Sequence, residues 1–114
     1  MVSYIDLSLF GIYFFNKKKS IYLLQMESIP YDKRSGKIWF NGKTVDWKDA
    51  NIHILNHGLH YASCVFEGER VYDGEIFKLE DHTERLFYSA KRMGIKVPYS
   101  QKEINDASKN IVNI

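Results

Sequence analysis

The sequence predicts an α+β domain, an antiparallel sheet with flanking helices. Two pairs of β-type runs, within residues 37–47 and 64–79, are each joined by a two-residue turn signal. Two amphipathic segments follow, at residues 79–95 and after Pro98. Strand pairs followed by helices are typical of an antiparallel sheet with helices packed on it. At 114 residues and 45% hydrophobic content, the chain is long enough for one domain with a core.

The first hairpin is predicted from KIWFNGKTVDW, residues 37–47, because Asn41 and Gly42 favour the two positive φ angles of a type I′ turn. Residues 50–54 alternate well enough to predict another short extended piece. The run NHGLHY that follows is interpreted as a loop, since it is polar and contains Gly58.

The second hairpin pairs residues 64–72 with 75–79 around the turn Asp73-Gly74. Side chains alternate across a strand, so its first arm has two faces. One face takes Cys64, Phe66, Gly68, Arg70 and Tyr72, and the other takes Val65, Glu67, Glu69 and Val71. A glycine inside a strand costs stability and has two interpretations here: a bulge or bend in the sheet, or the close approach of another molecule to the backbone.

Residues 79–95, LEDHTERLFYSAKRMGI, predict a helix with Asp81 as N-cap and Glu84 completing a capping box. Its apolar stripe is formed by Leu86, Ala90 and Met93, and Gly94 is placed for a left-handed C-terminal residue. A cation near a helix start, Arg85, opposes the helix dipole. It indicates either an external anion or a surface arginine that pairs with Asp81 or Glu84.

A last helix is predicted after Pro98, with Ser100 and Glu103 repeating the capping-box spacing. Its apolar positions are Ile104, Ala107, Ile111 and Val112. The sequence ends inside this pattern, which predicts a truncated protein or, alternatively, a short terminal helix.

Charge and composition exclude several functions. The formal net charge is only +2, with both signs interleaved, so nucleic acid is not an expected partner. The single cysteine, Cys64, cannot form an internal disulfide; it is interpreted as a small buried hydrophobe in a cytoplasmic protein. His53, His57 and His60 have helical spacing, but Gly58 argues against a helix there and no carboxylate is near, so no metal site is predicted.

Residues 1–25 differ in composition from the rest. They are apolar and aromatic, with the run of lysines 17–19 behind, and Met26 opens a sequence of ordinary globular composition. We expect residues 1–25 to be a non-homologous extension outside the folded part, and residues 26–114 to be an incomplete domain. A weak membrane-associating segment is the competing interpretation. The apolar run is too short for a spanning helix, so no membrane partner is expected.

The run HGLHYASCVFEGERVY, the Asp-Gly hairpin and DHTERL together resemble the amino-terminal domain of branched-chain amino acid aminotransferases. These enzymes belong to the pyridoxal-phosphate fold type IV class. The resemblance covers residues 37–114, with WFNG as an early marker. Two sister families, the D-amino acid aminotransferases and the aminodeoxychorismate lyases, typically carry a DRG-x-x-FGDG-type run where this chain has HGLHYASCVFEG. This difference favours the branched-chain enzymes.

The resemblance implies roles for individual residues. Arg85 would bind the phosphate of pyridoxal 5′-phosphate. Tyr61 and Phe66 would line the hydrophobic substrate pocket, with Tyr61 reaching the partner subunit of a homodimer. Gly68 would let substrate and cofactor lie close to the strand, and Arg70 would be a supporting charge near the pocket.

The resemblance also implies an activity, the transfer of an amino group from leucine, isoleucine or valine to 2-oxoglutarate through a Schiff base between a lysine and the cofactor. That lysine lies in the half of such enzymes that follows this domain. No lysine here matches its motif, so no catalytic residue is assigned and the isolated chain is expected to be inactive. The alternatives are a catalytically dead interaction or dimerisation module, and a relative with D-amino acid aminotransferase or lyase activity.

Overall fold

The computed structural model describes residues 2–8 and 30–114. Its strands are β1 (Val2–Ser8), β2 (Lys37–Phe40), β3 (Lys43–Asp46), β4 (Cys64–Tyr72) and β5 (Glu75–Ile76). Its helices are α1 (His57–Tyr61), α2 (Leu79–Arg92) and α3 (Gln101–Val112), with the short 3₁₀ turns η1 (Tyr31–Lys33) and η2 (Trp47–Asp49). The lysine run 17–19 lies outside the described residues.

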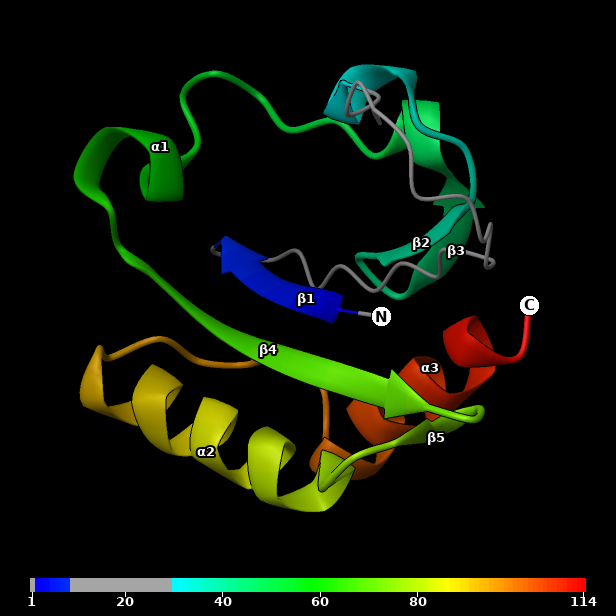
Figure 1. The fold of residues 1–114 in the computed structure, drawn as a ribbon. Helices are drawn as coiled ribbons and strands as arrows, with labels where there is room; N and C mark the ends of the chain where they lie inside the picture. The colour runs from blue at the N-terminus through cyan, green and yellow to red at the C-terminus, as the bar shows by residue number, and fades with distance from the viewer. Residues whose placement is uncertain (1, 9–29) are drawn as a thin grey trace.

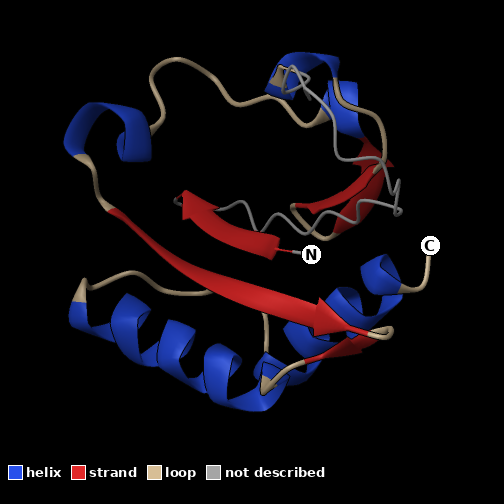
Figure 2. Cartoon of the chain, viewed as in Figure 1, coloured by secondary structure: helices blue, strands red, loops and turns tan. Residues whose placement is uncertain are grey.

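Two antiparallel sheets with helices against them confirm the predicted α+β class. One sheet has the order β1-β4-β5 and the other pairs β2 with β3. Helix α2 runs along one face of β4, and α3 packs beside α2 (Figure 1). The same view coloured by element type shows α2 below β4 and α3 beside the end of β4 that continues into β5 (Figure 2). Strand β4 is therefore the element on which the helical layer is built.

Strand β1 pairs with β4 along nearly its whole length, from Val2 opposite Arg70 to Ser8 opposite Cys64. Residues 2–8 therefore belong to the sheet, whereas the sequence placed them outside the folded part. The assignment of residues 1–25 as a non-homologous extension stays a prediction. No helix in the described part of the chain is long and apolar enough to cross a membrane.

Both predicted hairpins are confirmed. The φ angles of Asn41 and Gly42 are +49° and +83°, and those of Asp73 and Gly74 are +48° and +88°. Two consecutive positive φ angles define the turns that match the twist of paired strands. Strand β5 is shorter than the predicted 75–79, because the backbone takes a left-handed conformation at Lys78 and α2 begins at the next residue.

The prediction for residues 50–61 was wrong in two respects. Residues 50–54 form no strand, and α1 occupies the segment interpreted as a loop. The helix forms because the Asn56 side chain accepts a hydrogen bond from the Gly58 backbone N–H at 2.8 Å and acts as N-cap.

In the described residues no group of three or more His, Cys, Asp and Glu side chains is placed to hold a metal ion.

Helix α2 confirms the predicted C-terminus but not the predicted cap. Its N-cap is Lys78, and Asp81 lies inside the first turn, in an ion pair with Lys78 at 3.3 Å. At the other end Gly94 has a φ of +70° and the Ile95 N–H bonds back to the Ala90 carbonyl, as in a Schellman motif. Met93, predicted on the apolar stripe, is exposed.

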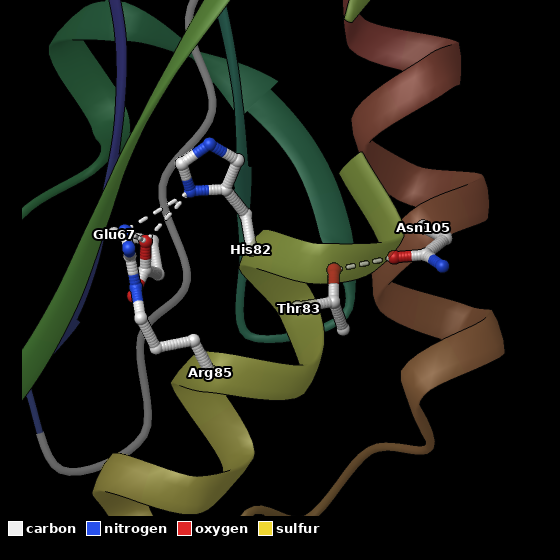
Figure 3. Close-up of polar contacts among 5 residues, drawn as sticks. All are labelled: Glu67, His82, Thr83, Arg85 and Asn105. Atoms are coloured by element: carbon white, nitrogen blue, oxygen red, sulfur yellow. Dashed lines mark hydrogen bonds and ion pairs between the residues drawn. The ribbon is translucent and has the colours of Figure 1, made fainter. Parts of the chain in front are cut away.

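The capping box of α3 is confirmed, since the Ser100 side chain accepts from the Glu103 N–H and Glu103 accepts from the Ser100 N–H. The core lies between α2, α3 and the strands and contains Trp39, Val65, Leu86, Ala90, Ile104, Ala107 and Ile111. A part-buried hydrogen bond from the Thr83 hydroxyl to the side-chain amide oxygen of Asn105 ties α2 to α3 (Figure 3). These contacts fix the helical layer beneath β4.

Candidate functional site

Strand β4 has the two faces that its alternation predicts. Val65, Glu67, Glu69 and Val71 are buried toward the helices, and the residues between them are exposed or half-buried. Phe66, 66% exposed, Gly68 and Arg70 therefore form one continuous outward face, while both glutamates point into the helical layer. The sequence thus placed two acidic side chains on the face that is covered, an arrangement that needs a physical explanation.

Gly68 lies at the middle of the outward face. Pairing with β1 continues through it without interruption, so the bulge interpretation is wrong. A Cβ built on Gly68 would meet nothing within 4 Å, and its φ lies outside the left-handed range that favours glycine. Nothing in the described part of the chain therefore requires a glycine at this position.

Glu67 is the hydrogen-bond partner of two side chains on α2, His82 and Arg85, that are directed at β4 (Figure 3). The Arg85 Nε and Nη2 atoms donate to its two oxygens at 2.6 and 2.5 Å, a side-on bidentate contact. His82 Nδ1 lies 2.8 Å from Glu67 Oε2. The Glu67 side chain is only 4% exposed, so nearly all of its carboxylate is held by these two residues.

Glu67 is ionised at neutral pH. Burial raises the pKa of its carboxyl, but hydrogen bonds from Arg85 and His82 together with their charges outweigh burial and lower that pKa overall. An ionised carboxylate only accepts, so the chemistry of the partners assigns a proton to His82 Nδ1. The 3.3 Å approach of Arg85 Nη2 to the same nitrogen is then a contact between two donors.

Glu69, two residues further along the same face, has a different environment. Its side chain is 1% exposed, and its Oε1 atom has no hydrogen-bond partner among the described residues. Burial, with the nearby charges of Glu67 and Glu80, raises the pKa of Glu69 to about 7. Sequence reasoning missed both glutamates as structural features, although the alternation that put them on the covered face was available.

Arg85 differs from both sequence-based alternatives. Its partner is Glu67 of β4, not Asp81 or Glu84 of its own helix. It is also further from the helix start than expected, since α2 begins at Leu79, which weakens the argument from the helix dipole. The Arg85 side chain is 62% exposed, and no described residue contacts its Nη1 atom. An edge of the guanidinium is therefore open to solvent.

The structure brings together some of the predicted site residues and separates others. Phe66, Gly68 and Arg70 share the outward face of β4, whereas Arg85 meets the strand on the helix side. Tyr61 lies on α1, 70% exposed, with its ring centroid 4.6 Å from that of His57. Opposite β1, strand β5 pairs only with Val71 and Tyr72, so this edge of β4 has no strand partner from Cys64 to Glu69 in the described structure.

Comparison with known proteins identifies the protein family that this arrangement resembles. The sequence profile of the amino-transferase class IV family matches residues 64–113, which include β4, the second hairpin, α2 and α3. This part of the chain is a class IV aminotransferase segment. The match includes CVFEG and DHTERL of the predicted resemblance, which is confirmed for residues 64–113, and Glu67, Gly68 and Arg85 all lie inside this aminotransferase segment.

Three curated relatives are named as branched-chain-amino-acid aminotransferases. A probable branched-chain-amino-acid aminotransferase of Rickettsia felis is 52% identical over 75 residues, which are 66% of this chain and 26% of that protein. The branched-chain-amino-acid aminotransferases of Pseudomonas aeruginosa and Escherichia coli K12 are 49% and 39% identical over 83 and 84 residues, about 70% of this chain and 27% of each protein. The chain spans about a quarter of the length of these relatives.

Proposed function

We propose that this chain forms the amino-terminal part of a pyridoxal-phosphate-dependent branched-chain aminotransferase, acting on leucine, isoleucine or valine with 2-oxoglutarate. One observation carries the proposal: within the aminotransferase segment, the exposed guanidinium of Arg85 is held against β4 by the buried carboxylate of Glu67. The relatives named above support the branched-chain substrates. A homodimer in the cytoplasm completes the proposal, in keeping with Cys64 as a free thiol.

The residues present fit the phosphate of pyridoxal 5′-phosphate. A guanidinium is a planar, permanently charged fork that suits phosphate oxygens, and Arg85 has an exposed edge whose N–H groups have no described partner. We therefore assign phosphate binding to Arg85. When bound, the cofactor supplies the electron sink for amino-group transfer, and the protein supplies binding and orientation.

The outward face of β4 suits the substrate side chain. Phe66 presents an exposed aromatic surface, Gly68 leaves open space beside it, and Arg70 adds a positive charge. Tyr61 is proposed to line the same pocket. Because Arg85 lies on the other face, a bound molecule that reaches both would cross β4 at the edge where no described strand pairs with Cys64 to Glu69.

No catalytic residue is assigned in this chain. Lys78, Lys102 and Lys109 are in surface ion pairs with Asp81, Asp106 and Glu80, and neither Lys91 nor Lys96 is a better candidate for the Schiff-base lysine. We propose that this lysine lies in a region corresponding to the part of the relatives that the chain does not span. Turnover therefore requires that region, and the 114-residue chain alone is expected to be inactive.

A second candidate is an interaction or dimerisation module without catalysis. The exposed aromatic side chains Tyr72 and Phe77, whose ring centroids lie 6.3 Å apart, favour it, since clustered exposed apolar groups mark interaction surfaces. D-amino acid aminotransferase or lyase activity has no such observation in its favour, and the relatives speak for the branched-chain enzymes.

The experiment measures binding of pyridoxal 5′-phosphate to the 114-residue chain by calorimetry, with Arg85→Ala and Arg92→Ala as a matched pair on α2. We expect binding that is lost in Arg85→Ala and retained in Arg92→Ala, which removes the same charge. A chain that binds no cofactor, either alone or mixed with the carboxy-terminal part of a relative, would favour the interaction module. Transamination of leucine by the chain alone would show that the missing lysine is not needed.

A further inference from the structure

The guanidinium of Arg85 has two edges that can donate a pair of parallel hydrogen bonds. One is formed by Nε and Nη2, and both of these atoms are bonded to Glu67. The other is formed by Nη1 and the second N–H of Nη2. No described residue accepts a hydrogen bond from Nη1, and His82 Nδ1, which lies 3.3 Å from Nη2, is itself a donor and does not accept from it. The structure therefore decides which edge is open to a ligand.

A ligand cannot readily displace Glu67 from the Nε–Nη2 edge of Arg85. Its side chain is 4% exposed on a strand that is paired with β1 through this position, and His82 is its only other partner in the described structure. A ligand that took the Nε edge would leave a buried, ionised carboxylate with a single hydrogen-bond donor, which is a costly arrangement. The exposed Nη1–Nη2 edge offers binding without that cost.

We propose that Glu67 is a positioning residue, which holds the Arg85 guanidinium side-on so that a phosphate monoester binds end-on through Nη1 and Nη2. This inference rests on the proposed function and adds to it how the phosphate arginine is oriented. His82 supports the same carboxylate from one turn earlier on α2. Because Arg85 and Glu67 neutralise each other, the site gains its affinity from hydrogen-bond geometry more than from net charge.

The test shortens the carboxylate without changing its charge. Glu67→Asp keeps the negative charge but moves it back by one methylene, so the bidentate contact is lost. Glu69→Asp is the matched control, since it makes the same change two residues along the same buried face with no contact to Arg85. The measurements are the solvent exchange of the Arg85 Nε–H by NMR and the affinity for pyridoxal 5′-phosphate and for inorganic phosphate by calorimetry.

We expect a slowly exchanging Arg85 Nε–H in the unmodified chain and in Glu69→Asp, and a fast one in Glu67→Asp. Affinity for pyridoxal 5′-phosphate and inorganic phosphate should fall about tenfold in Glu67→Asp only. Equal affinities in Glu67→Asp and the unmodified chain would overturn the inference, as would a rapidly exchanging Nε–H in the unmodified chain. The NMR measurement needs no ligand. Failure to bind the cofactor, alone or with the carboxy-terminal part of a relative, would therefore count against the proposed function, while the Glu67–Arg85 contact would still be tested.

A second variant covers the case in which Glu67→Asp does not fold. Arg85→Lys keeps the positive charge and the pairing with Glu67, but a lysine ammonium has no planar second edge. The same tenfold loss of phosphate affinity is expected in a chain that still folds. Affinity equal to that of the unmodified chain would show that a held guanidinium is not required.

Discussion

Glu67 and Glu69 lie two residues apart on the same buried face of β4, yet among the described residues only Glu67 has a cationic partner. Two carboxyl groups in one covered layer thus have pKa values displaced in opposite directions: that of Glu67 is lowered and that of Glu69 is raised to about 7. One carboxyl holds an arginine in place, and the other is a buried acid that the protein tolerates in its neutral form. Substitution of each glutamate by glutamine separates these roles.

Replacing Glu69 with glutamine should remove a pH-dependent loss of stability. The folded-state pKa of Glu69 lies above its ordinary value of 4.5, so its favourable contribution is fully present below about pH 4.5 and is lost as pH rises through 7. Between pH 5 and pH 8, Glu69→Gln should therefore gain up to about 3 kcal/mol of unfolding free energy relative to the unmodified chain. Urea unfolding at both pH values measures this difference, and a gap that does not change with pH would contradict it.

Replacing Glu67 with glutamine should have the opposite pH dependence. Its folded-state pKa is lowered, so its contribution is present above the ordinary value of 4.5 and is lost as pH falls through the folded-state value. Glu67→Gln should cost about 1–3 kcal/mol of unfolding free energy at pH 7, because Arg85 and His82 lose a charged acceptor. Urea unfolding at pH 7 and pH 3 should show the difference shrinking in acid. The exposed Glu84 on α2 offers the control, for which Glu84→Gln should change stability by less than about 0.5 kcal/mol.

A cavity-forming substitution in the core of the helical layer should cause a larger loss of stability. Leu86 is fully buried between α2 and α3, and Leu86→Ala should cost about 2–5 kcal/mol through lost burial and the cavity left behind. Met93, one predicted member of the same stripe, is 53% exposed. Met93→Ala should therefore be nearly neutral, and chemical denaturation of the pair measures the contrast. Equal losses of stability would mean that α2 buries a different face, one that includes Met93.

Local signals in the sequence predicted the elements wherever a few neighbouring residues decide the backbone. The two turns, the Ser100 capping box and the Gly94 terminus depend on such residues, and all are confirmed. The N-cap of α2 was misplaced because the left-handed backbone at Lys78 has no sequence signature. Helix α1 was missed because one hydrogen bond, donated by the Gly58 N–H to the Asn56 side chain, outweighs the polar composition of the segment.

The candidate site depended on contacts between distant residues, which a sequence pattern does not specify. Alternation placed Phe66, Gly68 and Arg70 on one face, and this arrangement is confirmed. The partner of Arg85 lies 18 positions away on another element, so spacing within the helix pointed to the wrong carboxylates. The pairing of β1 with β4 is a contact of the same long-range kind.

Gly68 provides the sharpest separation between a structural and a ligand-related role. A Cβ at Gly68 or Gly74 would meet nothing within 4 Å, but only Gly74 has a positive φ, of +88°. Gly74→Ala should therefore destabilise the chain by about 1 kcal/mol or more, whereas Gly68→Ala should leave stability unchanged or raise it by up to about 1 kcal/mol. If the outward face accepts a ligand, Gly68→Ala should still weaken binding of pyridoxal 5′-phosphate or leucine, because the new methyl group occupies the open space beside Phe66. Thermal unfolding and calorimetry on the two variants measure both effects, and a Gly68→Ala protein that is destabilised but binds normally would assign the glycine to the fold.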